Sequence, residues 1–353
     1  LFRSELSWRS IAWITIGDAY TREGEMMLAR EARSNALEAS KTSGDAYLII
    51  IVNLTLAETL RQQGELQKVI DICEHQLKIA EESGFSELEV IGWLLGMWGE
   101  VLAELNNLDS AIDIAKKGVK LTALGRDVLY ISFSNLCLVR VLFSSGNLTG
   151  AEDVIYSLED TARKFDVPHW TLIQISAWKA RIWLAQGKLK SVSQWVEERQ
   201  FDTEGEITYQ HEMAYIMFAR ILIAQKRLDE AIRLTQRLHI AAETGERKTN
   251  LIEILLIQTL AFHKAGDTNQ AMLSLKIALR IAEPKGFIRT FVDEGPPMAE
   301  LLEKILEAKT DIPRVYIKKL LSVFNITKLI KTNEGLLEQL SERELDVLRF
   351  MAA

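Results

Sequence analysis

The chain has 353 residues, of which 42 are Lys or Arg and 49 are Asp or Glu, so its formal net charge is −7. A hydrophobic share of 48% excludes an intrinsically disordered chain. The acidic balance argues against a surface dedicated to nucleic acid, because neutralising phosphates needs an excess of basic residues. Two cysteines, Cys73 and Cys137, are too few for a disulfide scaffold and lack metal-ligand spacing, which indicates a reduced, cytoplasmic setting.

Proline placement divides the chain into two zones. Pro168 is the only proline before Pro284. Because proline breaks helix interiors, the first 283 residues can be almost wholly helical. Sustained apolar–polar alternation between hairpin turns is missing, so strands are not expected. The longest apolar run considered, residues 47–52, is far shorter than the roughly 18 residues that a transmembrane helix needs.

A turn followed by the start of a helix recurs about every 40 residues. The turn is followed by a small residue at Ala29, Val69, Ala111, Ala151, Val192, Ala231 and Ala271. A second series of turns runs out of phase with the first, at Gly44, Gly84, Gly125, Asp166, Gly205, Gly245 and Gly286. Two interleaved series with one period predict two helices per repeat, and about seven helix pairs fill residues 1–285.

The first repeat indicates which kind of helix pair this is. Trp13, Gly17 and Tyr20, followed by Ala29 and Ala36, follow the tetratricopeptide pattern. Two paired helices approach closely where that pattern has its small residue, and the aligned positions hold Gly17, Ala57, Gly99, Val139, Ala180, Ala219 and Thr259. The predicted fold is therefore all-α: tetratricopeptide-like repeats stacked in a right-handed superhelix, an α-solenoid.

Charged residues follow the small residue on successive first helices, on the side expected to line the concave groove. Asp18, Glu58 and Glu100 come first, and Arg140, Arg181 and Arg220 follow. One interpretation is a ligand site with an acidic and a basic part, since arginine forks suit carboxylate or phosphate. The other is that neighbouring helices pair these charges with Glu or Asp. Trp93 faces the groove on the same alignment, as a binding wall or as core.

Sequence motifs for catalysis are missing. The sequence has no phosphate-binding P-loop, no His-Glu-x-x-His or paired-Cys metal motif and no nucleophile elbow. We therefore predict no enzyme activity, no catalytic residue, no metal and no cofactor in this chain.

The C-terminal part leaves the repeat pattern. Residues 286–325 are predicted as a capping segment with short helices, from about Ala299 to Lys309 and from Pro313 to Phe324. Residues 326–339 lack a clear apolar face and are predicted as a linker. Within residues 340–353, Ser341 and Glu344 form a capping box that starts another helix.

The last segment, Leu-Ser-Glu-Arg-Glu-Leu-Asp-Val-Leu at residues 340–348, resembles the first helix of a LuxR-type helix-turn-helix domain. Phe-Val-Asp-Glu-Gly-Pro-Pro-Met at residues 291–298, after a helical array, is similar to MalT-like, large ATP-dependent LuxR-family transcriptional regulators. The resemblance implies an upstream ATP-binding domain, a sensor superhelix and a downstream DNA-binding domain. It places ATP and operator DNA outside this chain, which it identifies as an excised middle module.

Two functions remain open. In the first, a small-molecule inducer binds in the groove and biases the regulator toward self-association and DNA binding, which requires different affinities for two states. In the second, the groove is a scaffold for a peptide, an inhibitory protein or another protomer, with no small-molecule ligand. The candidate ligand-binding residues are Arg140, Arg181, Arg220, Trp93, Glu100 and Glu58.

Overall fold

The computed structural model describes residues 2–202, 205, 207–308 and 310–337, and every regular element within these ranges is a helix. This confirms the all-α prediction. The chain forms two compact units, residues 1–289 and residues 290–353. None of the described helices is both long and apolar enough to cross a membrane.

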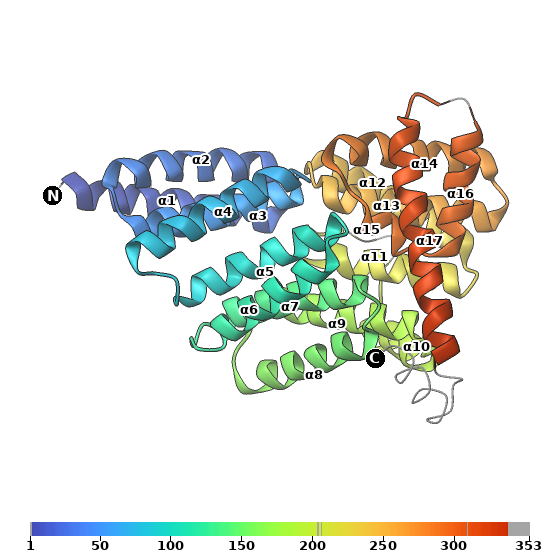
Figure 1. Ribbon diagram of the computed structural model, residues 1–353, viewed down its shortest axis with the longest axis horizontal. Helices are drawn as coiled ribbons and strands as arrows, with labels where there is room; N and C mark the ends of the chain where they lie inside the picture. Colours follow the sequence, from blue (N-terminus) through green and yellow to red (C-terminus); the bar gives the residue numbers. More distant parts are fainter. Residues whose placement is uncertain (1, 203–204, 206, 309, 338–353) are drawn as a thin grey trace, which may run out of the picture. The chain divides into compact units, whose positions relative to one another are not determined.

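The first unit contains the repeats, which follow one another in chain order (Figure 1). The first helices of the pairs are α1 (Phe2–Glu23), α3 (Ala46–Gln62), α5 (Glu89–Glu104), α7 (Val128–Ser144), α9 (His169–Ala185), α11 (Tyr209–Ala224) and α13 (Lys248–Ala265). The second helices are α2 (Met26–Ser43), α4 (Leu66–Ser83), α6 (Leu108–Thr122), α8 (Leu148–Lys164), α10 (Leu189–Arg199), α12 (Leu228–Thr244) and α14 (Thr268–Ala282), and a 3-10 turn (Glu283–Lys285) follows α14.

Each pair is closed by one residue in the left-handed conformation. Glycine holds this place in five pairs, and Asn106 (φ 66°) and Lys226 (φ 62°) hold it in the other two. Left-handed φ is accessible to asparagine but strained for lysine. The turn geometry is thus the same in all seven pairs, even where the sequence signal for it is missing.

Close approach of the paired helices is what the small residues allow. A Cβ atom on Gly99 of α5 would lie 2.9 Å from both the Ala111 carbonyl oxygen and the Ala115 Cβ of α6. The predicted small positions are buried in every pair: Gly17, Ala57, Gly99, Val139, Ala180, Ala219 and Thr259. The core then continues from pair to pair, as in the cluster of Ala111, Leu142, Ile155 and Ile182 from α6 to α9.

Repeats that are distant in sequence also meet within the first unit. Hydrogen bonds join the first three repeats to the last repeat and the residues that follow it: Arg247 Nη1 to the Gly24 carbonyl (2.9 Å), Thr249 Oγ1 to the Arg61 carbonyl (2.6 Å) and Ile288 N to Glu104 Oε1 (3.1 Å). Lys285 also pairs with Glu65. The ends of the array are therefore held together by polar contacts.

The second unit contains α16 (Pro296–Glu307) and α17 (Arg314–Leu337), and α15 (Arg289–Val292) crosses from the first unit into it. The double proline starts α16 as predicted. The predicted end of the last helix near Phe324 is wrong, because α17 continues to Leu337 through residues predicted as a linker. No proline follows Arg314, and an indistinct apolar face does not itself end a helix. The helix predicted after Ser341 lies outside the described residues.

Replacing Gly99 tests the close approach of α5 and α6. Gly99→Val places new atoms against the backbone of α6, so we expect it to lower the free energy of unfolding by about 1–3 kcal/mol, as measured by urea denaturation. Lys116→Val introduces the same side chain at an exposed position of α6 and is the control. Equal stability of the two variants would contradict the assigned packing.

Candidate functional site

The three arginines of the predicted basic stretch converge on glutamates. Arg181 Nη1 lies 2.5 Å from Glu253 Oε1 of α13, and Arg220 Nη2 lies 2.9 Å from the same oxygen. Arg140 Nη2 lies 2.6 Å from Glu104 Oε2 of α5. These five residues, which we call the inner ionic cluster, come from five successive repeats. The arginines are thus paired with glutamates, as in the alternative interpretation, but the partner of Arg181 comes from two repeats away rather than from a neighbouring helix.

The inner ionic cluster is largely removed from solvent, since its side chains are 7–15% exposed. Burial alone raises the pKa of Glu253, but the positive charges of Arg181, Arg220 and Arg140 outweigh it and hold this pKa at about 2. Glu253 is therefore ionised at neutral pH, and all three arginines contribute to its charge state.

The predicted acidic stretch is also neutralised from within. Arg61 of α3 forms a fork onto Glu58, with Nε to Oε2 at 2.9 Å and Nη2 to Oε1 at 2.8 Å, and its Nη1 lies 2.9 Å from Glu100 Oε1. The Cys137 thiol donates to Glu100 Oε2 at 3.3 Å. Burial, followed by the charge of Glu100, raises the pKa of this thiol, which stays protonated. Glu58, Arg61, Glu100 and Cys137 form what we call the acidic cluster.

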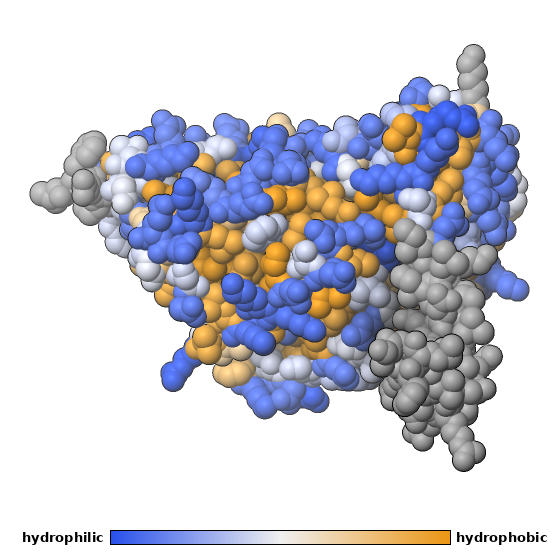
Figure 2. Space-filling view, in the orientation of Figure 1, coloured by the Kyte–Doolittle hydropathy of each residue, from blue (hydrophilic) through white to orange (hydrophobic). Residues whose placement is uncertain are grey.

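Trp93 lies beside the acidic cluster rather than beside the predicted arginines. Its ring centroid is 4.8 Å from that of Phe133 and 5.3 Å from that of Tyr130. The guanidinium of Arg61 lies 5.9 Å from the centre of the Phe133 ring, which connects these aromatics to the acidic cluster. The indole Nε1 of Trp93 is buried and has no hydrogen-bond partner. In Figure 2 hydrophobic side chains reach the surface over the α5–α7 part of the first unit.

Sequence reasoning missed Glu253, Arg61 and Glu104. Glu253 stands two helical turns before Leu260, the residue of its own first helix that aligns with the charged positions, and it occupies the same position in its repeat as Trp93 and Phe133 in theirs. Arg61 and Glu104 stand three and four residues after Glu58 and Glu100. A search of each first helix for charged residues one turn after, or two turns before, the aligned charged position finds these three residues.

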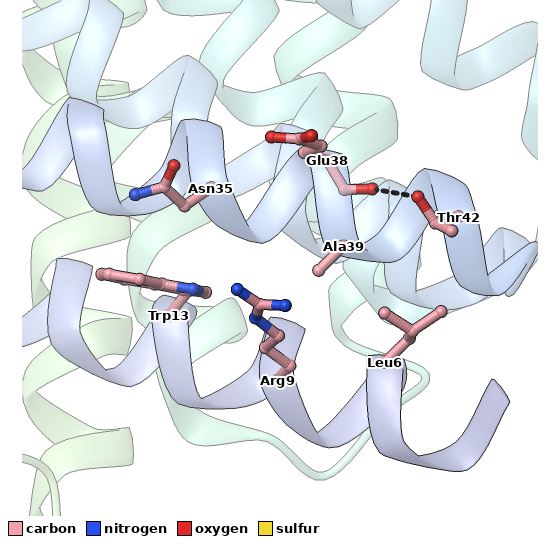
Figure 3. A pocket seen from close by; sticks show the side chains of 7 residues that line it. All are labelled: Leu6, Arg9, Trp13, Asn35, Glu38, Ala39 and Thr42. Carbon is pink, nitrogen blue, oxygen red and sulfur yellow. Dashed lines mark hydrogen bonds between the residues drawn. The ribbon is translucent and has the colours of Figure 1, made fainter. Parts of the chain in front are cut away.

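The structure also contains cavities away from the predicted residues. One, of about 200 Å³, lies between α1 and α2, where Leu6, Arg9 and Trp13 face Asn35 and Ala39 (Figure 3). It is smaller than the roughly 300–1,000 Å³ of typical ligand pockets. A second, of about 670 Å³, lies between α9, α10 and α11. None of the six predicted ligand residues lines either cavity.

Among the residues that the structure describes, no group of three or more His, Cys, Asp or Glu side chains is arranged to hold a metal ion.

The chain matches the model of a known protein family over most of its length. The model of the MalT-like TPR region matches residues 1–308. An HTH-type transcriptional regulator MalT of Vibrio cholerae is 24% identical over 259 residues, which cover 72% of this chain and 28% of the relative. The corresponding regulator of Yersinia pestis is 24% identical over 303 residues, which cover 85% of this chain and 33% of the relative. The chain thus spans a third or less of these relatives.

A solved structure described as Naa15/Naa10 bound to HypK-THB is 15% identical and aligns with 90% of this chain and 55% of its own, with a TM-score of 0.26. That score is too low to support an argument about this chain.

Acid should destabilise the first unit through Glu253. Its pKa is about 2 in the folded chain and 4.5 ordinarily, so the stability that it contributes is present above pH 4.5 and is lost as pH falls toward 2. The shift corresponds to roughly 3 kcal/mol. We expect Glu253→Gln to flatten the fall in unfolding free energy between pH 5 and 3, as measured by urea denaturation at each pH.

The same variant should be less stable at pH 7, by about 3–5 kcal/mol, because it leaves arginines buried without their carboxylate. Glu82→Gln, at an exposed position of α4, is the control and should retain the wild-type pH profile. An unchanged pH profile in Glu253→Gln would show that the inner ionic cluster does not control acid stability.

Proposed function

Because the chain belongs to the family of MalT-like TPR regions, we propose that it is the sensor and scaffold of a bacterial transcriptional regulator. A small-molecule inducer binds on the inner faces of the first helices, and its binding favours self-association and DNA binding by the intact protein. ATP and operator DNA bind to other parts of the regulator, which acts in the cytoplasm.

One observation carries this proposal: Arg181 and Arg220 meet Glu253 from repeats that are two and one pairs earlier in the chain. A buried ion pair adds little net stability, but losing one partner is strongly unfavourable. A ligand that takes over one or both arginines must therefore offer them an acceptor, and it displaces Glu253. Because Glu253 lies on α13, displacing it links ligand binding to the position of α13.

The position of α13 matters because its repeat also holds the contacts to the start of the array. Arg247, just before α13, donates from Nε to Glu212 Oε2 at 2.9 Å and from Nη1 to the Gly24 carbonyl. Thr249 in the first turn of α13 bonds to the Arg61 carbonyl. A shift of α13 strains these contacts, so an inducer binds the two arrangements with different affinities, which is the thermodynamic requirement for a switch.

The aromatic residues next to the acidic cluster supply a second part of the site. Trp93, Tyr130 and Phe133 present ring faces, and the free Nε1–H of Trp93 can donate to an acceptor on a ligand. The acidic cluster offers carboxylates to ligand hydroxyls. Rings, carboxylates and guanidinium groups along one set of helices favour a polar small molecule with several oxygen atoms.

A ligand screen with a variant that removes Glu253 together with both of its arginines tests this proposal. Replacing Arg181, Arg220 and Glu253 together with Gln removes the anion-binding groups without leaving a buried unpaired charge. The probes are neutral oligosaccharides and short dicarboxylates, and the readout is thermal unfolding. A ligand at a hundred times its dissociation constant should add about 2.7 kcal/mol to wild-type stability. We expect this gain to disappear in the triple variant.

Arg163→Gln, at an exposed position of α8, is the control and should keep the full gain. A gain retained in the triple variant would remove the ligand from the inner ionic cluster. If no probe stabilises the wild-type protein, the scaffold function is favoured, and immobilised peptides replace the small molecules in the screen.

A further inference from the structure

The cavity of about 670 Å³ between α9, α10 and α11 is distinct from the inner ionic cluster. Its lining combines three basic groups, His169 of α9, Arg199 of α10 and His211 of α11, with an apolar wall that includes Leu172 and Phe201. Its volume lies within the usual range for small-molecule sites.

Arg199 is half-buried and differs from six arginines that lie close to a carboxylate. The six with a carboxylate within ion-pair distance are Arg33, Arg61, Arg140, Arg181, Arg220 and Arg247. In the part of the chain that the structure describes, no carboxylate lies within that distance of Arg199. Its Nη2 instead donates to the Ser176 hydroxyl, and its guanidinium lies 5.7 Å from the centre of the Trp195 ring. Burial lowers its pKa and the charge of Glu198 raises it only in part, so the guanidinium is half-buried with no described carboxylate within ion-pair distance.

Two histidines lie beside Arg199 in the lining of the cavity. The rings of His169 and His211 have centroids 6.1 Å apart. Burial, then the nearby His169 and Arg199, lowers the pKa of His211, whose Nδ1 lies 2.9 Å from the Thr208 hydroxyl. An anion placed among Arg199, His169 and His211 pairs with the guanidinium and favours the protonated forms of the two histidines.

The acidic residues of the cavity lie at its exposed rim. Glu198 is exposed and accepts from Gln194 Nε2 at 2.7 Å. Asp202 is exposed, and its backbone carbonyl accepts from the Tyr215 hydroxyl at 3.0 Å. Burial, followed by the charge of Asp202, raises the pKa of Tyr215, and the charge of Arg237 of α12 lowers it in part. The two carboxylates of the lining are thus exposed, whereas Arg199 and His211 are partly buried.

The apolar wall is held rigidly. The ring of Phe201 stacks on Phe218 at 4.4 Å with an angle of 7° between their planes, and it lies 5.1 Å from Trp195. Ile173 and Ala214 are buried beneath the cavity, whereas Leu172 is 39% exposed. A ligand with an apolar ring gains by covering this surface.

We propose that this cavity binds an aromatic carboxylate, with the carboxylate against Arg199 and the two histidines and the ring against Leu172 and Phe201. The guanidinium fork matches two carboxylate oxygens, which a lysine does not. The site goes beyond the proposed inducer site and does not depend on it, because the two share no residue.

The test uses 3-phenylpropionate as the probe and 3-phenylpropylamine as a cation of matched shape. Histidine side-chain NMR reports the site directly, since the chain has 5 histidines. We expect 3-phenylpropionate to shift the signals of His169 and His211 and to raise the pKa of His211, and we expect the amine to do neither. Arg199→Gln should weaken binding at least about tenfold, as expected for the loss of a charge-assisted hydrogen bond.

Arg163→Gln is the matched control and should bind with wild-type affinity. Arg199→Lys keeps the positive charge but not the planar fork, so its affinity should lie between those of wild type and Arg199→Gln. This intermediate affinity distinguishes an effect of the charge from an effect of misfolding. Equal binding of the amine and the carboxylate, or undiminished binding to a folded Arg199→Gln variant, would overturn the proposal. Because the triple variant of the inner ionic cluster keeps this cavity, it should still bind 3-phenylpropionate, so the two proposals fail separately.

Discussion

The structure of the first unit depends on pairing charges that the repeats place largely out of water. Each helix pair closes on a small residue, and on six of the seven first helices the next residue is charged. A buried charge in that position is stable only with a partner, and for four of the six the partner comes from another repeat: Glu253 for Arg181 and Arg220, Glu104 for Arg140, and Arg61 for Glu100. The packing of the pairs and the pairing of the charges therefore fix the register of the array together.

Local features of this arrangement could be read from the sequence because they depend on neighbours within one repeat. The period of about 40 residues, the small residue at Gly99 and the turns before α2 and α8 are set by contacts between adjacent helices, and the structure has them where the pattern placed them. The turn before α12 shows the limit. There Lys226 takes a left-handed conformation that its residue type disfavours, because the flanking helices determine the path of the chain.

The partners of the predicted site residues could not be read in the same way. Glu253 is 72 residues from Arg181, and Ile288 is 184 residues from Glu104, so these contacts depend on how far the array turns over several repeats. That turn accumulates from small rotations between neighbouring pairs, and a repeat pattern does not encode it. The length of α17 was missed for a different reason, since a helix with an indistinct apolar face lacks the periodic signal on which the prediction depended.

The inner ionic cluster and the α9–α11 cavity differ in what an anionic ligand must displace in order to bind. In the inner ionic cluster the arginines already have carboxylates, so an anionic ligand has to compete with Glu253, and its binding energy is partly used to move α13. In the cavity no carboxylate of the described residues lies within ion-pair distance of Arg199, so a ligand there does not have to displace a paired carboxylate. A ligand that displaces an internal partner changes the conformation of the protein when it binds. A ligand that pairs with a charge lacking an ion-pair partner can bind tightly without changing the conformation. On this physical ground the inner ionic cluster is the better candidate for the switch, and the cavity is the better candidate for a stably held ligand.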